Sequence, residues 1–138
     1  MKADFLDAHR RHLCHADSLF GASRLANADH LYGMAAECGL KRLMIAFGMK
    51  PRPADGAPEN REDKAHVDKV WVRYEAYRSG QVQGVQYGLP SSSPFDDWKV
   101  SQRYAPENHF DRARVEPHHT AAHQVNALIK SAETAGLG

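Results

Sequence analysis

Two residues that can act on a phosphodiester lie close together in the last third of the chain. Arg103 and His109 are separated by five residues in the stretch RYAPENH. A histidine can act as general acid or base on the ribose 2′-hydroxyl or the leaving 5′-oxygen of RNA. An arginine can hold the phosphate through two N–H groups and stabilise developing negative charge. The pair therefore predicts RNA cleavage without a metal. The alternative is that Arg103 ends a helix, where a cation suits the dipole, and that His109 lies in a polar loop.

The chain has nine histidines, and two further groups of them could bind a metal. His9, His12 and His15 follow one another at three-residue steps, each of which turns about 60° around a helix, so they do not share one face. His9 and His12 are expected in the core or at an interface. His119 and His123 have the spacing of two zinc ligands on one helix face, but a third ligand would have to come from elsewhere in the chain. We predict a solvated helix face there, with no metal and no other cofactor.

Composition indicates an ordinary globular protein. The 138 residues are 42% hydrophobic and 25% charged, with a formal net charge of +1, so no strong overall field attracts nucleic acid or a membrane. No run approaches the roughly 20 apolar residues of a membrane span. The two cysteines, Cys14 and Cys38, do not form the disulfide framework of a secreted protein, and a cytoplasmic location is expected.

Apolar residues recur at helical spacing along most of the chain, and no alternation of strands with helices is found. We predict a single all-α domain over residues 1–138, an up-and-down bundle of four main helices with two long loops and a short extra helix. The main helices are expected at residues 4–22, 24–48, 61–79 and 117–135, the short one at 94–104, and the loops at 48–60 and 80–93.

The second predicted helix carries small residues on a wide apolar face: Gly33, Ala35, Ala36 and Gly39. Glycine inside a helix costs roughly 1 kcal/mol relative to alanine, so close approach by another backbone is the expected reason for keeping two. Such a surface is compatible with a homodimer.

The stretch ANADHLYGMAAECGLKRLM resembles the second helix of HEPN domains. In that family a small residue, an aromatic residue and an A-E-x-x-L-K string recur in this order, and here they are Ala28, Tyr32, Ala36, Glu37, Leu40 and Lys41. The preceding helix and turn, the segment AHVDKVWVRY and the segment WKVSQRY resemble further parts of the same family.

The resemblance implies a helical bundle that dimerises and either of two functions. Many HEPN domains are metal-independent ribonucleases of toxin or defence type, whose arginine and histidine, four to six residues apart, form a site across the dimer. Arg103 and His109 match this spacing, with Tyr104 where active members usually have a polar residue, and Glu37, Lys41 and Tyr104 are candidates to line the substrate groove. Other members are non-catalytic modules that pair with a nucleotidyltransferase or another protein. Both functions remain open from the sequence.

Overall fold

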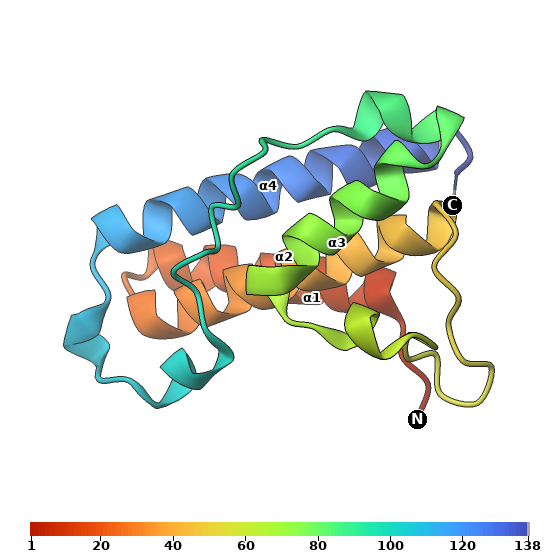
Figure 1. Ribbon diagram of the computed structural model, residues 1–138. Helices are drawn as coiled ribbons and strands as arrows, with labels where there is room; N and C mark the ends of the chain where they lie inside the picture. The colour runs from red at the N-terminus through yellow and green to blue at the C-terminus, as the bar shows by residue number, and fades with distance from the viewer. Residues whose placement is uncertain (138) are drawn as a thin grey trace.

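The computed structural model describes residues 1–137, and Gly138, the last residue of the predicted domain, lies outside them. Four α-helices dominate the fold, and no strand occurs within the described residues (Figure 1). The helices are α1 (Phe5–Gly21), α2 (Leu25–Ala46), α3 (Val67–Ser79) and α4 (Arg112–Thr134). Short 3-10 helices lie between them: η1 (Arg61–Lys64), η2 (Val82–Tyr87), η3 (Val100–Tyr104) and η4 (Glu107–His109). The predicted all-α bundle of four main helices is thus confirmed.

The direction of the helices departs from simple up-and-down alternation. Only three residues connect α1 to α2, which makes these two helices antiparallel neighbours. Twenty residues separate α2 from α3, and thirty-two separate α3 from α4 (positions 47–66 and 80–111). These long connections cross back along the bundle, so α2, α3 and α4 all run in the same direction (Figure 1). The up-and-down order expected from the sequence holds for the first pair of helices alone.

Helix α2 forms the centre of the bundle. Its buried positions face α1, α3 and α4 in turn, as its wide apolar face predicted. The largest fully buried side chains come from α2 and its C-cap, from α3 and from the segment before η3: Tyr32, Phe47, Tyr74, Phe95 and Trp98. The two glycines of α2 make room for side chains rather than for another backbone. A Cβ on Gly33 would lie 2.1 Å from Trp98 Cε2, and one on Gly39 would lie 2.5 Å from Val125 Cγ1.

Helix α4 begins earlier than predicted, at Arg112 instead of Pro117. Asp111 is its N-cap and accepts a hydrogen bond from the backbone N–H of Arg114 at 2.8 Å. Pro117 therefore lies in the second turn, where it cannot donate to the carbonyl of Ala113. Both residues are exposed, so water can satisfy that carbonyl. Asp111, and not Pro117, marks the start of this helix in the sequence.

Two other predicted helices are divided or replaced. The helix expected at 61–79 is interrupted after η1, and His66 starts α3 as its N-cap. Asp63 in η1 is buried and is held by Arg73 at 2.8 Å and Tyr77 at 2.5 Å, which fixes this interruption. The helix expected at 94–104 is wrong: residues 94–97 form turns, and regular structure begins only with η3.

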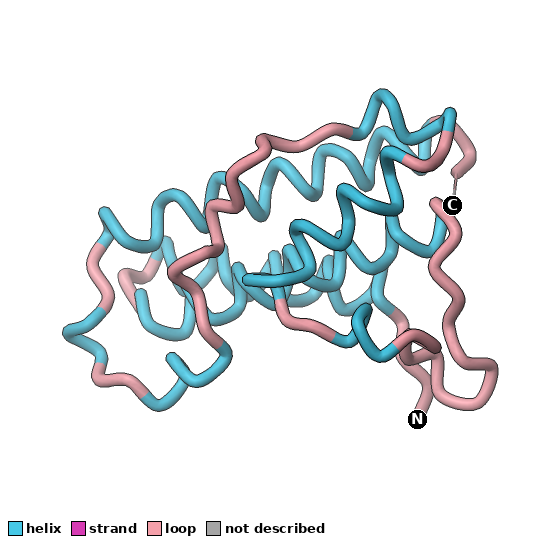
Figure 2. Tube along the Cα trace, viewed as in Figure 1, coloured by secondary structure: helices cyan, strands magenta, loops and turns pink. Residues whose placement is uncertain are grey.

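Residues 88–111 form a strap that runs along the bundle from η2 to α4 and is mostly loop (Figure 2). Phe95, Trp98 and Gln102 of the strap are buried. Inward residues spaced by three and four look like one turn of α-helix in the sequence, but a turn followed by a 3-10 helix has nearly the same period. The strap carries Arg103, Tyr104 and His109, so its attachment decides where these residues lie.

Candidate functional site

A stripe of polar residues lies along the otherwise apolar helix α2. Glu37 and Lys41 are buried, with 6% and 5% of their surface exposed, and the Lys41 ammonium donates to Glu37 Oε2 at 3.2 Å. A buried charge is tolerated only when it is paired and hydrogen-bonded, and four-residue spacing on a helix allows this pairing. Two of the three groove candidates chosen from the sequence, Glu37 and Lys41, are therefore paired on α2.

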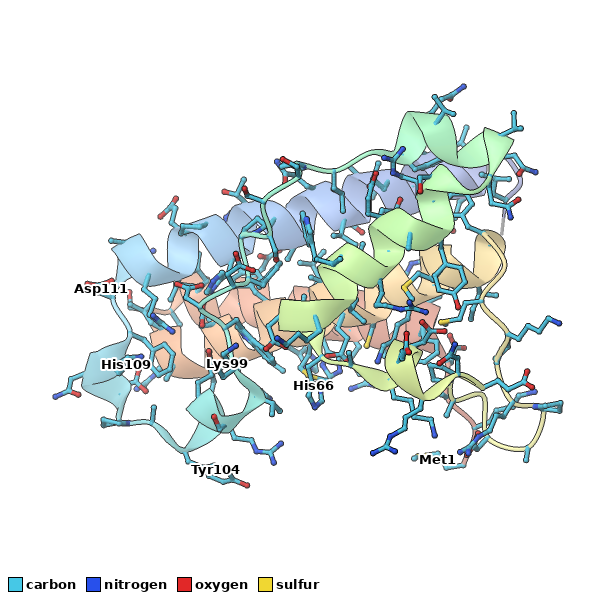
Figure 3. All side chains as sticks on the ribbon, viewed as in Figure 1. Met1, His66, Lys99, Tyr104, His109 and Asp111 are labelled. Atoms are coloured by element: carbon cyan, nitrogen blue, oxygen red, sulfur yellow. The ribbon has the colours of Figure 1, made fainter. Side chains whose placement is uncertain are left out.

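His66 completes the partners of Glu37. Its Nδ1 lies 3.0 Å from Glu37 Oε1, while its ring remains 46% exposed. Because His66 is the N-cap of α3, this contact fixes the start of α3 against the middle of α2. Both carboxylate oxygens of Glu37 are now engaged, one by a buried lysine and one by a solvent-reachable imidazole (labelled in Figure 3).

His30 lies on the same face of α2, seven residues and about two turns before Glu37. Its ring stacks on Trp98 at a centroid distance of 5.8 Å and an interplanar angle of 13°. Its buried Nδ1 has no hydrogen-bond partner within residues 1–137. Burial, followed by the positive charge of Arg103, holds the pKa of His30 below its ordinary value. His30 is accordingly a neutral imidazole at pH 7, the form that can accept a proton.

The strap is held to α2 by Asp29. Gln102 donates to Asp29 Oδ2 at 2.6 Å, and the indole N–H of Trp98 donates to the Asp29 carbonyl at 3.1 Å. Gly33 leaves the space that the Trp98 ring occupies. Arg103 directly follows Gln102, so these contacts fix the backbone beside Arg103 against the residue that precedes His30.

His118 of α4 fixes the strap from the other side. Its Nδ1 lies 2.5 Å from Asp29 Oδ1, and its Nε2 lies 2.8 Å from Asp97 Oδ1. Its ring also stacks on Phe95 at 5.0 Å. Burial lowers the pKa of His118, but the hydrogen bonds and charges of Asp29 and Asp97 outweigh burial and raise it. A protonated His118 bridging two carboxylates thus ties α2, α4 and the strap together.

The residues predicted as a catalytic pair are both on the strap and both exposed. The Arg103 guanidinium lies 5.0 Å from the ring of Tyr104, which is 78% exposed and points away from the bundle (Figure 3). His109, in η4, packs edge-on against Phe110. Tyr104 and His109 line one open hollow of about 370 Å³, and Arg103 is not among its lining residues. No hydrogen bond or ion pair joins Arg103 to His109 in the described chain.

Sequence reasoning missed the residues that position Arg103. These residues come from three separate segments of the chain, so no regular sequence spacing relates them to one another. They are Asp29 in α2, Asp97 and Gln102 in the strap, and His118 in α4. A weak signal existed for His30, because it stands seven residues before Glu37 on one helix face. The core role predicted for His9 is confirmed: its ring nitrogens lie 2.8 Å from the Ala35 carbonyl and 3.0 Å from Asn126 Oδ1.

No known protein family, curated protein or solved structure matches this chain. Among residues 1–137, no helix has both the length and the apolar character that crossing a bilayer requires.

Proposed function

We propose that this protein is a cytoplasmic, HEPN-like endoribonuclease that cleaves RNA without a metal and acts as a homodimer in a toxin or defence role. The observation that supports the proposal is the attachment of the strap: Gln102, the residue before Arg103, donates to Asp29, the residue before His30, at 2.6 Å. The positive charge of Arg103 also contributes, after burial, to lowering the pKa of His30. A cation that can bind phosphate and a neutral imidazole are the two groups that metal-independent RNA cleavage needs.

The reaction follows from these two groups. Neutral His30 accepts the proton of the ribose 2′-hydroxyl, and the 2′-oxygen attacks phosphorus. The bond from phosphorus to the 5′-oxygen breaks, and the leaving oxygen takes a proton from a general acid. The products are a 2′,3′-cyclic phosphate and a 5′-hydroxyl end. Arg103 stabilises the charge that develops on the phosphoryl oxygens.

Two histidines compete for the role of base. Sequence spacing and the HEPN resemblance favour His109, whereas the electrostatic effect of Arg103 favours His30. His66 is the candidate acid, because Glu37 orients its ring while nearly half of it stays exposed. Lys41 pairs with the second carboxylate oxygen of Glu37. Tyr104 presents an exposed ring on which a nucleobase of the RNA can stack.

The test is cleavage of pooled tRNA and mRNA in EDTA by wild type and by the Arg103→Ala, His30→Ala and His109→Ala variants. Removing a general base is expected to slow cleavage about 10²- to 10⁴-fold. The controls are Arg61→Ala, which removes an exposed arginine from another 3-10 helix, and His15→Ala, which removes an exposed histidine from α1. Both controls are expected to cleave as wild type does.

Each outcome assigns the site differently. Loss of cleavage in Arg103→Ala and His30→Ala supports the pairing favoured by electrostatics. Loss in Arg103→Ala and His109→Ala supports the pairing by spacing. Absence of cleavage by wild type, or cleavage that survives Arg103→Ala, overturns the proposal. Sedimentation equilibrium measures the proposed dimer directly.

The second candidate function is a non-catalytic module that pairs with a nucleotidyltransferase or another protein. Three large apolar side chains on the adjoining elements α3 and η2 favour it: Val72, Val82 and Val85 are 67%, 91% and 74% exposed. Contact with a partner would remove these three side chains from water, which is favourable for apolar groups. This candidate takes precedence if wild type does not cleave RNA.

A further inference from the structure

Three potential metal ligands meet at the end of the bundle where α1 ends and α4 begins. Asp17 comes from the last part of α1, and His119 and His123 come from one face of α4. One ligand atom from each residue lies within 4.8 Å of the other two. Asp17 thus supplies, from a distant part of the chain, the third ligand that the sequence around the two histidines lacks.

The distances are close to those of a coordination sphere. Asp17 Oδ1 lies 2.9 Å from His123 Nε2 and 3.8 Å from His119 Nε2. Zinc–nitrogen and zinc–oxygen bonds of about 2.0–2.2 Å in a tetrahedral site place neighbouring ligand atoms roughly 3.3–3.6 Å apart. The two distances from Asp17 lie on either side of this range, so small side-chain movements bring its Oδ1 to ligand spacing from both histidines.

Neighbouring aromatic residues hold the ligands in place. The Tyr32 hydroxyl donates to Asp17 Oδ1 at 2.6 Å. Burial, together with the bond to Asp17, raises the pKa of Tyr32, so the phenol stays protonated and continues to donate. The His119 ring stacks on Phe20 at 5.0 Å and meets the edge of Tyr32 at 5.2 Å. Such outer partners orient metal ligands and strengthen binding.

The site is open to solvent, and within residues 1–137 no lysine or arginine forms an ion pair with its carboxylate. The side chains of Asp17, His119 and His123 are 41%, 33% and 39% exposed, so an ion can reach all three. The nearby Arg112 lies over Phe20 and donates to the Phe20 carbonyl and to Ser23 instead of to Asp17. A divalent ion here meets one carboxylate and two imidazoles.

We propose that Asp17, His119 and His123 form a binding site for a divalent transition-metal ion, with Zn²⁺ as its representative. Two imidazoles and one carboxylate favour zinc or a similar metal over Mg²⁺, which prefers oxygen ligands. Three protein ligands leave at least one position for water or another ligand. The ion also joins α1 to α4. This site shares no residue with the proposed ribonuclease site, and the inference does not depend on that function.

The test is calorimetric titration of the tag-free chain with Zn²⁺ at pH 7.5, with Mg²⁺ titrated in parallel. Wild type is expected to bind one Zn²⁺ per chain and no Mg²⁺. Binding is expected to be lost in Asp17→Asn, His119→Ala and His123→Ala. Tyr32→Phe keeps all three ligands and removes the hydrogen bond to Asp17, so affinity is expected to fall about 10- to 100-fold. Circular dichroism checks that each variant is folded.

His15→Ala is the matched control, because it removes an exposed histidine of α1 that lies outside the ligand set. It is expected to bind Zn²⁺ as wild type does. Binding well below one ion per chain, or equal affinity in wild type and His119→Ala, overturns the proposal. Binding is also expected to weaken at pH 5.5, since protonated imidazoles cannot ligate. Undiminished binding at that pH contradicts histidine ligation.

Discussion

His118 and His119 are neighbours on α4, yet they belong to opposite kinds of site. The side chain of His118 is 1% exposed and lies between Asp29 and Asp97, whereas that of His119 is 33% exposed and lies near Asp17. One residue turns a helix by about 100°, so the two rings face different surroundings. The same pairing of imidazole and carboxylate therefore fixes the fold in the interior and leaves ligand atoms available at the surface.

The largest difference in stability is expected between a variant that lacks a buried histidine and one that lacks a partly exposed histidine. His118→Ala leaves the buried carboxylate of Asp29 without its charged partner, and the free energy of unfolding is expected to fall by about 3–5 kcal/mol. His123→Ala removes a partly exposed contact with Asp17 and is expected to cost less than about 1 kcal/mol. Urea unfolding in EDTA at pH 6 measures both. Losses of equal size would show that burial does not distinguish the two clusters.

A second prediction concerns Gly33, which leaves the space that the Trp98 ring occupies beside the buried hydrogen-bond network of Asp29. Gly33→Ala places a Cβ 2.1 Å from the indole, so the ring must move, at an expected cost of about 1–3 kcal/mol. Gly21→Ala is the control, since a Cβ there meets nothing within 4 Å. Urea unfolding gives the stability change, and tryptophan fluorescence reports the displaced ring. An unchanged spectrum and stability in Gly33→Ala would contradict the described packing.

Buried His118 and half-buried His30 are expected to make the stability of the protein depend on pH in opposite directions. The pKa of His118 is raised, so its contribution is fully present below about pH 6.5, the ordinary value, and is lost as pH rises through the folded value. The pKa of His30 is lowered, chiefly by burial, so stability is lost as pH falls below about 6.5. Urea unfolding from pH 5 to 9 measures both slopes.

Single substitutions separate these two contributions. His118→Ala is expected to flatten the loss of stability above pH 6.5, and His30→Ala is expected to flatten the loss below it. If His118→Ala leaves the profile above pH 6.5 unchanged, His118 is not protonated between its two carboxylates in the folded state.

The smallest effect is expected at Asp17. Asp17→Asn keeps an acceptor for Tyr32 and removes the charge facing His123, so without metal the free energy of unfolding is expected to change by less than about 1 kcal/mol. Thermal unfolding in EDTA measures this change. A loss of several kcal/mol would place Asp17 with the buried network and not with the open cluster.

The helices were largely predictable because their signals are local. The bounds of α1 and α2 lie within two residues of the ranges expected from apolar spacing. The loop at 48–60 was marked by its prolines and glycines. The strap was misjudged because Phe95, Trp98 and Gln102 point inward at a period that a helix shares. No local pattern distinguishes the two structures.

The candidate sites were less predictable, since their members are joined only by folding. Glu37 and Lys41 could be paired from their four-residue spacing, but His66 reaches them across a loop. Asp17 meets His123 across 106 positions, and Asp29 meets His118 across 89. Such pairs depend on the direction in which each helix runs, and the up-and-down order expected from the sequence is wrong for α3, which runs parallel to α2.

The strap makes polar attachments to α2 at Asp29, to α3 at Asp68 and Trp71, and to α4 at Arg114 and His118. Closing a loop of this length costs entropy, and because the strap has little regular structure, the burial of Phe95 and Trp98 is its main apolar compensation. We expect it to detach and reattach while the four helices stay folded, and amide hydrogen exchange would detect this as a shared low protection across residues 95–104. Warming would then remove Arg103 from His30 before the bundle melts, so that any activity resting on this pair would have a lower temperature limit than the protein itself.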